Sequence, residues 1–282
     1  MSQNLFYRRK NLLKQDDTAY LDLILEPIRV CAQYRPKFGQ GGKTGITLEQ
    51  FQSLYQSDLF YSWFGLDNPL MYAAHKAAGG MTSIYRQIGI GCERLFRRVL
   101  QDTLDLSSEA VTWSYEMIGP SGRKRVLYLD GRVPIAEIPD SRIRQRFEDW
   151  MRASARTLGV EDNVLEALTG TVFEIRQGYK SKDAKRQNAD IANAATAYIK
   201  GYLPCVAILS AQIDADILTR YRMEKWSVLI GVLGHNDPLH STYDFMRETI
   251  GYDLAAFFER NKQTLREEIG EALHSLLMPG ML

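Results

Sequence analysis

The stretch VFEIRQGYKSKDAKRQNAD, residues 172–190, opens as a strand and then becomes polar and basic. Strand alternation places Val172, Glu174 and Arg176 on one face, with Phe173 and Ile175 on the other. A carboxylate inside a strand that is buried on both faces is costly unless it is paired or binds a metal. Glu174 is therefore predicted to have a counter-ion or a metal as its partner.

Downstream of this strand, strand-like and helix-like segments alternate. This order predicts parallel strands joined by right-handed crossovers. The expected elements are a strand at Thr171–Gln177, a helix at Lys185–Lys200, a strand at Cys205–Ser210, a helix at Asp214–Met223 and a strand at Trp226–Leu233.

Upstream, the apolar residues alternate with period two, which predicts an antiparallel meander of three strands. The expected strands are Val111–Met117, Arg125–Leu129 and Arg132–Ile138, with a hairpin at Asp130-Gly131. The predicted fold class is therefore α/β, with a mixed central sheet: an antiparallel meander followed by a parallel β-α-β-α-β part, flanked by helices.

The whole chain, residues 1–282, is expected to form a single domain, because no repeat or low-complexity linker divides it. Residues 1–80 are expected to form a helical N-terminal region and residues 244–282 a helical tail. In the first region, Thr47 and Gln50 form a capping-box pattern, and a helix from Asn68 is expected to stop at Gly79-Gly80.

Composition excludes several classes of protein. A hydrophobic fraction of 45% and a charged fraction of 24% are ordinary for a globular chain and exclude a disordered or fibrous one. No apolar run reaches the roughly 18–20 residues of a membrane span, so no membrane partner is expected. The three cysteines are far apart, which favours a reducing compartment, the cytoplasm, over a disulfide framework or a cysteine-based zinc site.

The net charge of +1 is an average over regions of opposite sign. Between Arg176 and Arg186 there are five basic residues and one acidic residue, whereas Phe245–Leu276 holds four basic and six acidic residues. A solvated helix entry is one interpretation of the basic run. Contacts with DNA phosphates and base edges are the other, and the candidate residues are Arg86, Gln177, Lys185, Arg186, Gln187 and Asn188.

A second acidic residue, Asp130, ends the strand VLYLD. Asp-Gly is also a favoured type I′ hairpin pair, which needs no function to explain it. Glu137, at the end of the next expected strand, is the alternative second acid.

The order of these elements resembles the layout of the PD-(D/E)xK nuclease superfamily. In that layout an acid lies on a meander strand, and a later strand carries a Glu-x-basic pattern. A helix and another strand follow. EIRQGYKSKDAKRQNAD resembles a type II restriction endonuclease core, as does MTSIYRQIGIGCERLFR at residues 81–97. The resemblance covers roughly residues 80–233. It implies a site-specific, Mg²⁺-dependent endonuclease that cuts double-stranded DNA as a homodimer.

In that resemblance, Asp130 and Glu174 would hold Mg²⁺, and Glu93 could supply a further carboxylate. The superfamily pattern has lysine two residues after the glutamate, where this chain has Arg176. Arginine can clamp a phosphate but is a poor general base. Lys180 and Lys182 share the strand's parity, but Lys180 would lie about 20 Å from Glu174 in a straight strand. A bend at Gly178 would shorten that distance, so Arg176, Lys180 and Lys182 all stay candidates for the catalytic cation.

Two other functions remain open on the sequence. One is a non-catalytic DNA-binding protein in which Arg176 has replaced the functional lysine. The other is a small-molecule α/β enzyme with Glu174 in a polar pocket.

Overall fold

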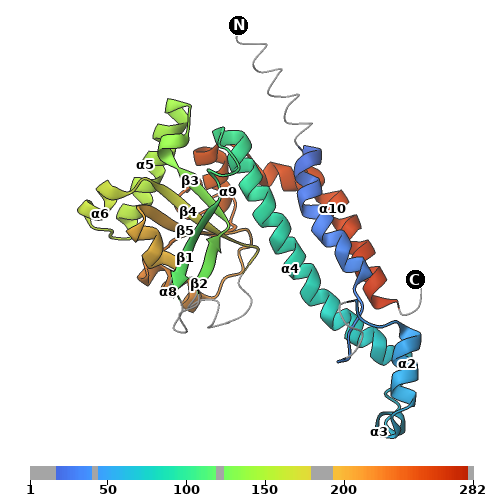
Figure 1. Cartoon of the computed structure of the whole chain (residues 1–282). Coiled ribbons are helices and arrows are strands. Elements are labelled where there is room, and N and C mark those ends of the chain that lie inside the picture. The colour runs from blue at the N-terminus through green and yellow to red at the C-terminus, as the bar shows by residue number, and fades with distance from the viewer. Residues whose placement is uncertain (1–16, 40–43, 119–123, 179–192, 279–282) are drawn as a thin grey trace. The chain divides into compact units, whose positions relative to one another are not determined.

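The computed structural model describes residues 17–39, 44–118, 124–178 and 193–278 (Figure 1). The chain divides into two compact units, Met1–Gly91 with Glu259–Leu282, and Cys92–Phe258. Two helices, α4 (Pro69–Leu104) and α10 (Leu254–Leu277), contribute to both units. The expectation of one domain over residues 1–282 stays a prediction. Within the described ranges, no helix combines the length and the apolar character needed to cross a membrane.

The second unit contains a four-stranded mixed sheet in the order β3-β4-β5-β6. β3 (Gly131–Pro134) pairs antiparallel with β4 (Gly170–Arg176). β5 (Tyr202–Ile208) then pairs parallel with β4, and β6 (Ser227–Leu229) pairs parallel with β5. The predicted mixed α/β fold, antiparallel and then parallel, is confirmed at this level.

The predicted three-stranded meander is wrong, because its strands are divided between two sheets. β1 (Trp113–Ile118) and β2 (Lys124–Leu129) form a separate two-stranded antiparallel sheet, whereas β3 pairs with β4. Asp130 therefore joins two strands that belong to different sheets and is not part of a hairpin turn. Its carboxylate accepts a hydrogen bond from the Ile175 backbone N–H at 2.8 Å, an interaction that a local turn signal cannot reveal.

The two faces of β4 carry different apolar clusters, as the alternation predicts. On one face, Val172 belongs to a buried cluster with Trp113, Trp226 and Tyr221. On the other face, the ring of Phe173 contacts the rings of Phe96, Trp150 and Phe245. The sheet is thus covered on both sides, and all seven residues of β4 are buried.

The helices of the second unit besides α4 and α10 connect and cover these strands (Figure 1). They are the 3-10 helix Ile135–Glu137, α5 (Ser141–Thr157), α6 (Asp162–Ala167), a helix over residues 193–199, α8 (Ala215–Met223), α9 (Thr242–Asp244) and the π-helix Phe245–Ile250.

The first unit is helical in its described part. It contains a helix over residues 17–29, a 3-10 helix at Val30–Gln33, α2 (Leu48–Gln56), α3 (Leu59–Trp63) and parts of α4 and α10. The predicted capping box at α2 is confirmed: the Gln50 N–H donates to Thr47 Oγ1 at 3.2 Å, and the Thr47 N–H donates to Gln50 Oε1 at 2.8 Å.

The predicted helix stop at Gly79-Gly80 is wrong, because α4 continues through both residues. A Cβ at Gly79 would collide with the Tyr34 ring, and one at Gly80 would collide with Leu276. These glycines allow close packing between segments far apart in sequence, and that gain offsets their low helix propensity.

The glycines of α4 provide a matched test of this packing. A Cβ at Gly91 would lie 2.8 Å from Ile24 Cα, whereas a Cβ at Gly89 would meet nothing within 4 Å. We expect Gly91→Ala to lower the free energy of unfolding by about 1–3 kcal/mol, because the helix over residues 17–29 must shift. Gly89→Ala is expected to raise it by about 0.5–1 kcal/mol. Urea denaturation measures both, and equal effects would contradict the packing role of Gly91.

Candidate active site

Asp130 and Glu174 come together where β3 begins beside β4. Gly131 pairs with Phe173 in the antiparallel register, so the preceding residue, Asp130, comes next to Glu174. Two hydrogen bonds hold Asp130 there. Its Oδ2 accepts from the Ile175 N–H at 2.8 Å, and its backbone oxygen accepts from Arg97 Nε at 2.8 Å.

Glu174 forms a buried ion pair with Arg176. The guanidinium Nη1 contacts Glu174 Oε1, and the two residues are 6% and 8% exposed. Their partners across the β4–β5 ladder are the apolar residues Val206 and Ile208. A partner was predicted for Glu174, either a counter-ion or a metal. In the structure Glu174 has a counter-ion, Arg176, on the same face of the strand. Removing one member of a buried ion pair typically costs about 3–5 kcal/mol, because the other charge is left buried.

The two carboxylates suit a hard cation such as Mg²⁺. Mg²⁺ takes oxygen ligands and is commonly held by one or two carboxylates together with water. Asp130, directly before β3, and Glu174, on β4, supply such a pair. The described residues contain no group of three or more His, Cys, Asp or Glu side chains that could hold a metal. Glu93, which lies partly buried on α4, therefore does not form such a group with the pair.

Glu137, the alternative second acid, lies elsewhere. It ends the 3-10 helix Ile135–Glu137 and is exposed. β3 runs away from Glu174 toward the pairing of Pro134 with Gly170, and Glu137 follows that end. Asp130 is the acid that the fold brings next to Glu174.

The predicted DNA contacts fall in three places. Gln177 directly follows β4 and is partly buried. Arg86 is exposed on α4 and belongs to the first unit. The remaining DNA-contact candidates lie outside the described residues: Lys185, Arg186, Gln187 and Asn188. Two candidates for the catalytic cation, Lys180 and Lys182, lie outside them as well.

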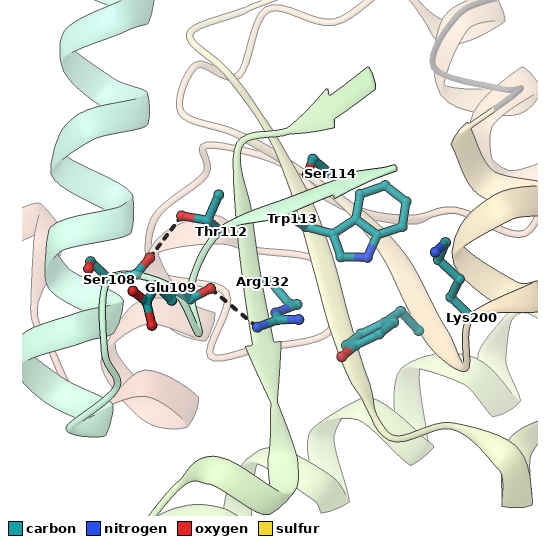
Figure 2. A pocket seen from close by; sticks show the side chains of 8 residues that line it. Ser108, Glu109, Thr112, Trp113, Ser114, Arg132 and Lys200 are labelled. Atoms are coloured by element: carbon teal, nitrogen blue, oxygen red, sulfur yellow. Dashed lines mark hydrogen bonds between the residues drawn. The ribbon is translucent and has the colours of Figure 1, made fainter. Parts of the chain in front are cut away.

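A pocket of about 770 Å³ lies beside β1 and β3 (Figure 2). Arg132, Trp113 and Lys200 line it, and Arg132 pairs with Val172, two residues before Glu174. The Arg132 guanidinium donates to the backbone oxygens of Ala110 at 2.6 Å and Glu109 at 3.2 Å. Arg132 therefore attaches the segment before β1 to the sheet.

Three polar residues of this region were missing from the sequence-based site. They are Arg97, which holds Asp130, and the buried pair Tyr115 and Asn193, in which the tyrosine hydroxyl donates to Asn193 Oδ1. Arg97 follows Glu93 by one helical turn, a spacing that could have suggested it. Tyr115 and Asn193 are 78 residues apart, so no local pattern connects them.

The cysteines do not supply a reactive thiolate to this region. Cys31, Cys92 and Cys205 are all buried and free. Burial raises the pKa of the Cys92 and Cys205 thiols to about 12 each, so both are protonated near neutral pH. The chemistry of the site rests on carboxylates and a guanidinium.

The chain was compared with protein families, curated proteins and solved structures. No family model, curated protein or solved structure matches the chain.

Proposed function

We propose that this protein is a Mg²⁺-dependent endonuclease that cuts double-stranded DNA at a specific site, as a type II restriction enzyme of the PD-(D/E)xK superfamily. One observation carries the proposal: Asp130, directly before β3, is bonded to the Ile175 N–H next to Glu174, and a cation, Arg176, lies on the same strand as Glu174. The basic and amide-rich sequence that follows β4 supplies groups for DNA phosphates and bases.

The roles of the residues follow from their chemistry. Asp130 and Glu174 would hold Mg²⁺, which, when bound, supplies charge stabilisation at the scissile phosphate and lowers the pKa of a bound water. The Ile175 N–H orients the Asp130 carboxylate. Arg176 stays protonated, so its role is to bind a phosphate oxygen and not to accept a proton.

A homodimer is part of the proposal. A two-fold symmetric enzyme places one active centre on each strand of a palindromic site. Each centre would then use Asp130 and Glu174 of its own chain.

Isosteric amide variants test the carboxylate roles. Glu174→Gln and Asp130→Asn keep side-chain size and an acceptor oxygen but remove the negative charge that binds a cation. We expect each to lower the rate of plasmid cleavage in Mg²⁺ at least about a hundredfold, because metal stabilisation of the transition state is worth several kcal/mol. Gel analysis of the digest measures the rate.

Glu116→Gln is the matched control for these variants. Glu116 lies on β1 of the same unit and forms an exposed ion pair with Lys124 at 3.1 Å. It should cleave like the wild type. Melting curves identify the temperature at which each variant is folded, because Glu174→Gln leaves the Arg176 charge buried and is expected to lower Tm. Cleavage is compared below the lowest Tm. Uncut plasmid with the wild type, or equal cutting by Glu174→Gln, would refute the nuclease proposal.

A non-catalytic DNA-binding protein is the second candidate. The ion pair between Glu174 and Arg176 favours it, because a buried carboxylate already balanced by a guanidinium has a structural role without a metal. It predicts duplex binding that weakens steeply with salt, as phosphate contacts require, and no strand breaks in Mg²⁺ or Mn²⁺.

Arg176→Lys separates the two candidates further. It restores the lysine of the superfamily pattern and keeps a positive charge beside Glu174. If the arginine abolished catalysis, this variant should cut DNA that the wild type only binds. A plasmid nicking assay at matched protein concentration measures the gain in cleavage. If the wild type binds DNA and Arg176→Lys still does not cut it, the arginine is not the cause of the missing activity.

A further inference from the structure

A second pocket, in the first unit, is lined by three cationic side chains. Its volume is about 650 Å³, and Arg35, Lys37 and Lys76 contribute the positive charges. Arg35 and Lys37 are exposed, and Lys76 is 7% exposed. Among the described residues, none of the three has a carboxylate within ion-pair distance. The pocket therefore gathers positive charge without an acidic counterpart from this part of the chain.

Lys76 is the least expected of the three. Lysine is almost never this buried unless it is paired. Its Nζ donates to the backbone oxygen of Ser275 at 2.8 Å. Burial, and then the positive charge of Arg35, lower the pKa of the Lys76 ammonium. A negatively charged ligand would offset both effects.

Capping of α10 explains part of this arrangement. Ser275 lies in the last turn of α10, where backbone oxygens lack partners within the helix and attract cations. That bond uses one of the three N–H donors of the ammonium. It does not account for the convergence of Arg35 and Lys37 on the same pocket.

The loop that carries Arg35 is held against the start of α2. Gly45 has φ +76°, and a Cβ there would collide with the Arg35 backbone. The Ile46 N–H donates to the Pro36 oxygen at 3.0 Å, and the Tyr72 hydroxyl donates to the Ile46 oxygen at 2.9 Å. Backbone contacts therefore fix the position of the Arg35 backbone beside the pocket.

The N-terminus of α2 also lines the pocket. Thr47, its N-cap, and Leu48, its first residue, both line the cavity. The N-terminal end of a helix carries partial positive charge and backbone N–H donors, both of which favour anions. Side-chain cations and the first residues of α2 thus line one space. The capping box already uses the Thr47 and Gln50 N–H groups, so the helix end contributes chiefly its partial positive charge.

We propose that this pocket binds the phosphate groups of a small phosphorylated compound. Phosphate carries up to two negative charges and accepts several hydrogen bonds, which matches three cations and a helix N-terminus. A volume of about 650 Å³ is typical of a small-molecule site. All of the pocket residues belong to the first unit, whereas Asp130 and Glu174 belong to the second, so the proposal does not rest on nuclease activity.

Pyrophosphate binding to the full chain tests the proposal. Isothermal titration with pyrophosphate and with inorganic phosphate, at constant ionic strength, should show saturable binding to the wild type, together with a rise in Tm. Lys76→Met keeps the aliphatic stem and removes the charge. Arg35→Gln with Lys37→Gln removes the two exposed charges. Each variant should weaken pyrophosphate binding at least about tenfold, the typical effect of losing one charge-assisted hydrogen bond.

Lys262→Gln is the control, because Lys262 lies on α10 of the same unit in an exposed pair with Glu259. It should bind like the wild type. If Lys76→Met does not fold, the double variant at exposed positions decides the question. Absence of saturable binding to the wild type, or unchanged binding by the double variant, would overturn the proposal. Displacement of pyrophosphate by a short duplex would also overturn it, since the pocket would then serve DNA phosphates.

Discussion

The buried ion pair between Glu174 and Arg176 imposes a constraint on everything around β4. Both charges lie in a strand whose seven residues are all buried, opposite apolar residues of β5. Such a pair is tolerated only when its geometry is held by the surrounding sheet, because water cannot replace a lost partner there. The parallel pairing with β5 and the aromatic rings on the Phe173 face supply that support.

Asp130 links this strand to the rest of the second unit. It lies between β2 and β3, which belong to different sheets, and its carboxylate accepts the Ile175 N–H beside the ion pair. Backbone N–H groups in a buried strand require an acceptor. A side-chain carboxylate serves here, and the same bond brings a second acid to Glu174. The structural and the proposed catalytic roles of Asp130 thus depend on one contact.

The cationic side chains of the two pockets differ in their bonding partners. Arg132 lines the pocket beside β1 and β3, but its guanidinium is bonded to two backbone oxygens and holds the segment before β1. Lys76 lines the pocket of the first unit beside Arg35 and Lys37, with no carboxylate partner in the described structure. The second arrangement points to an anionic ligand, because positive charges brought together in a cavity repel one another until a ligand balances them.

Much of the second unit could be predicted from local pattern. The alternation around Glu174 and the strand–helix order downstream of it indicated a parallel sheet, and the spacing of Thr47 and Gln50 indicated a capping box. Local pattern did not determine three other features. They are the position of Asp130 rather than Glu137 beside Glu174, the identity of the counter-ion of Glu174, and the continuation of α4 through Gly79-Gly80. Asp-Gly has the same local preference for a hairpin whether or not β3 pairs with β2. Glycine pairs likewise have the same low helix propensity whether or not Tyr34 and Leu276 pack on them.

The sequence by itself determined the strand that holds Glu174 and Arg176, because strand periodicity is a local property. The tertiary structure alone decided which acid lies beside Glu174 and which cations share a pocket with Lys76, because those contacts join residues that are distant in the sequence.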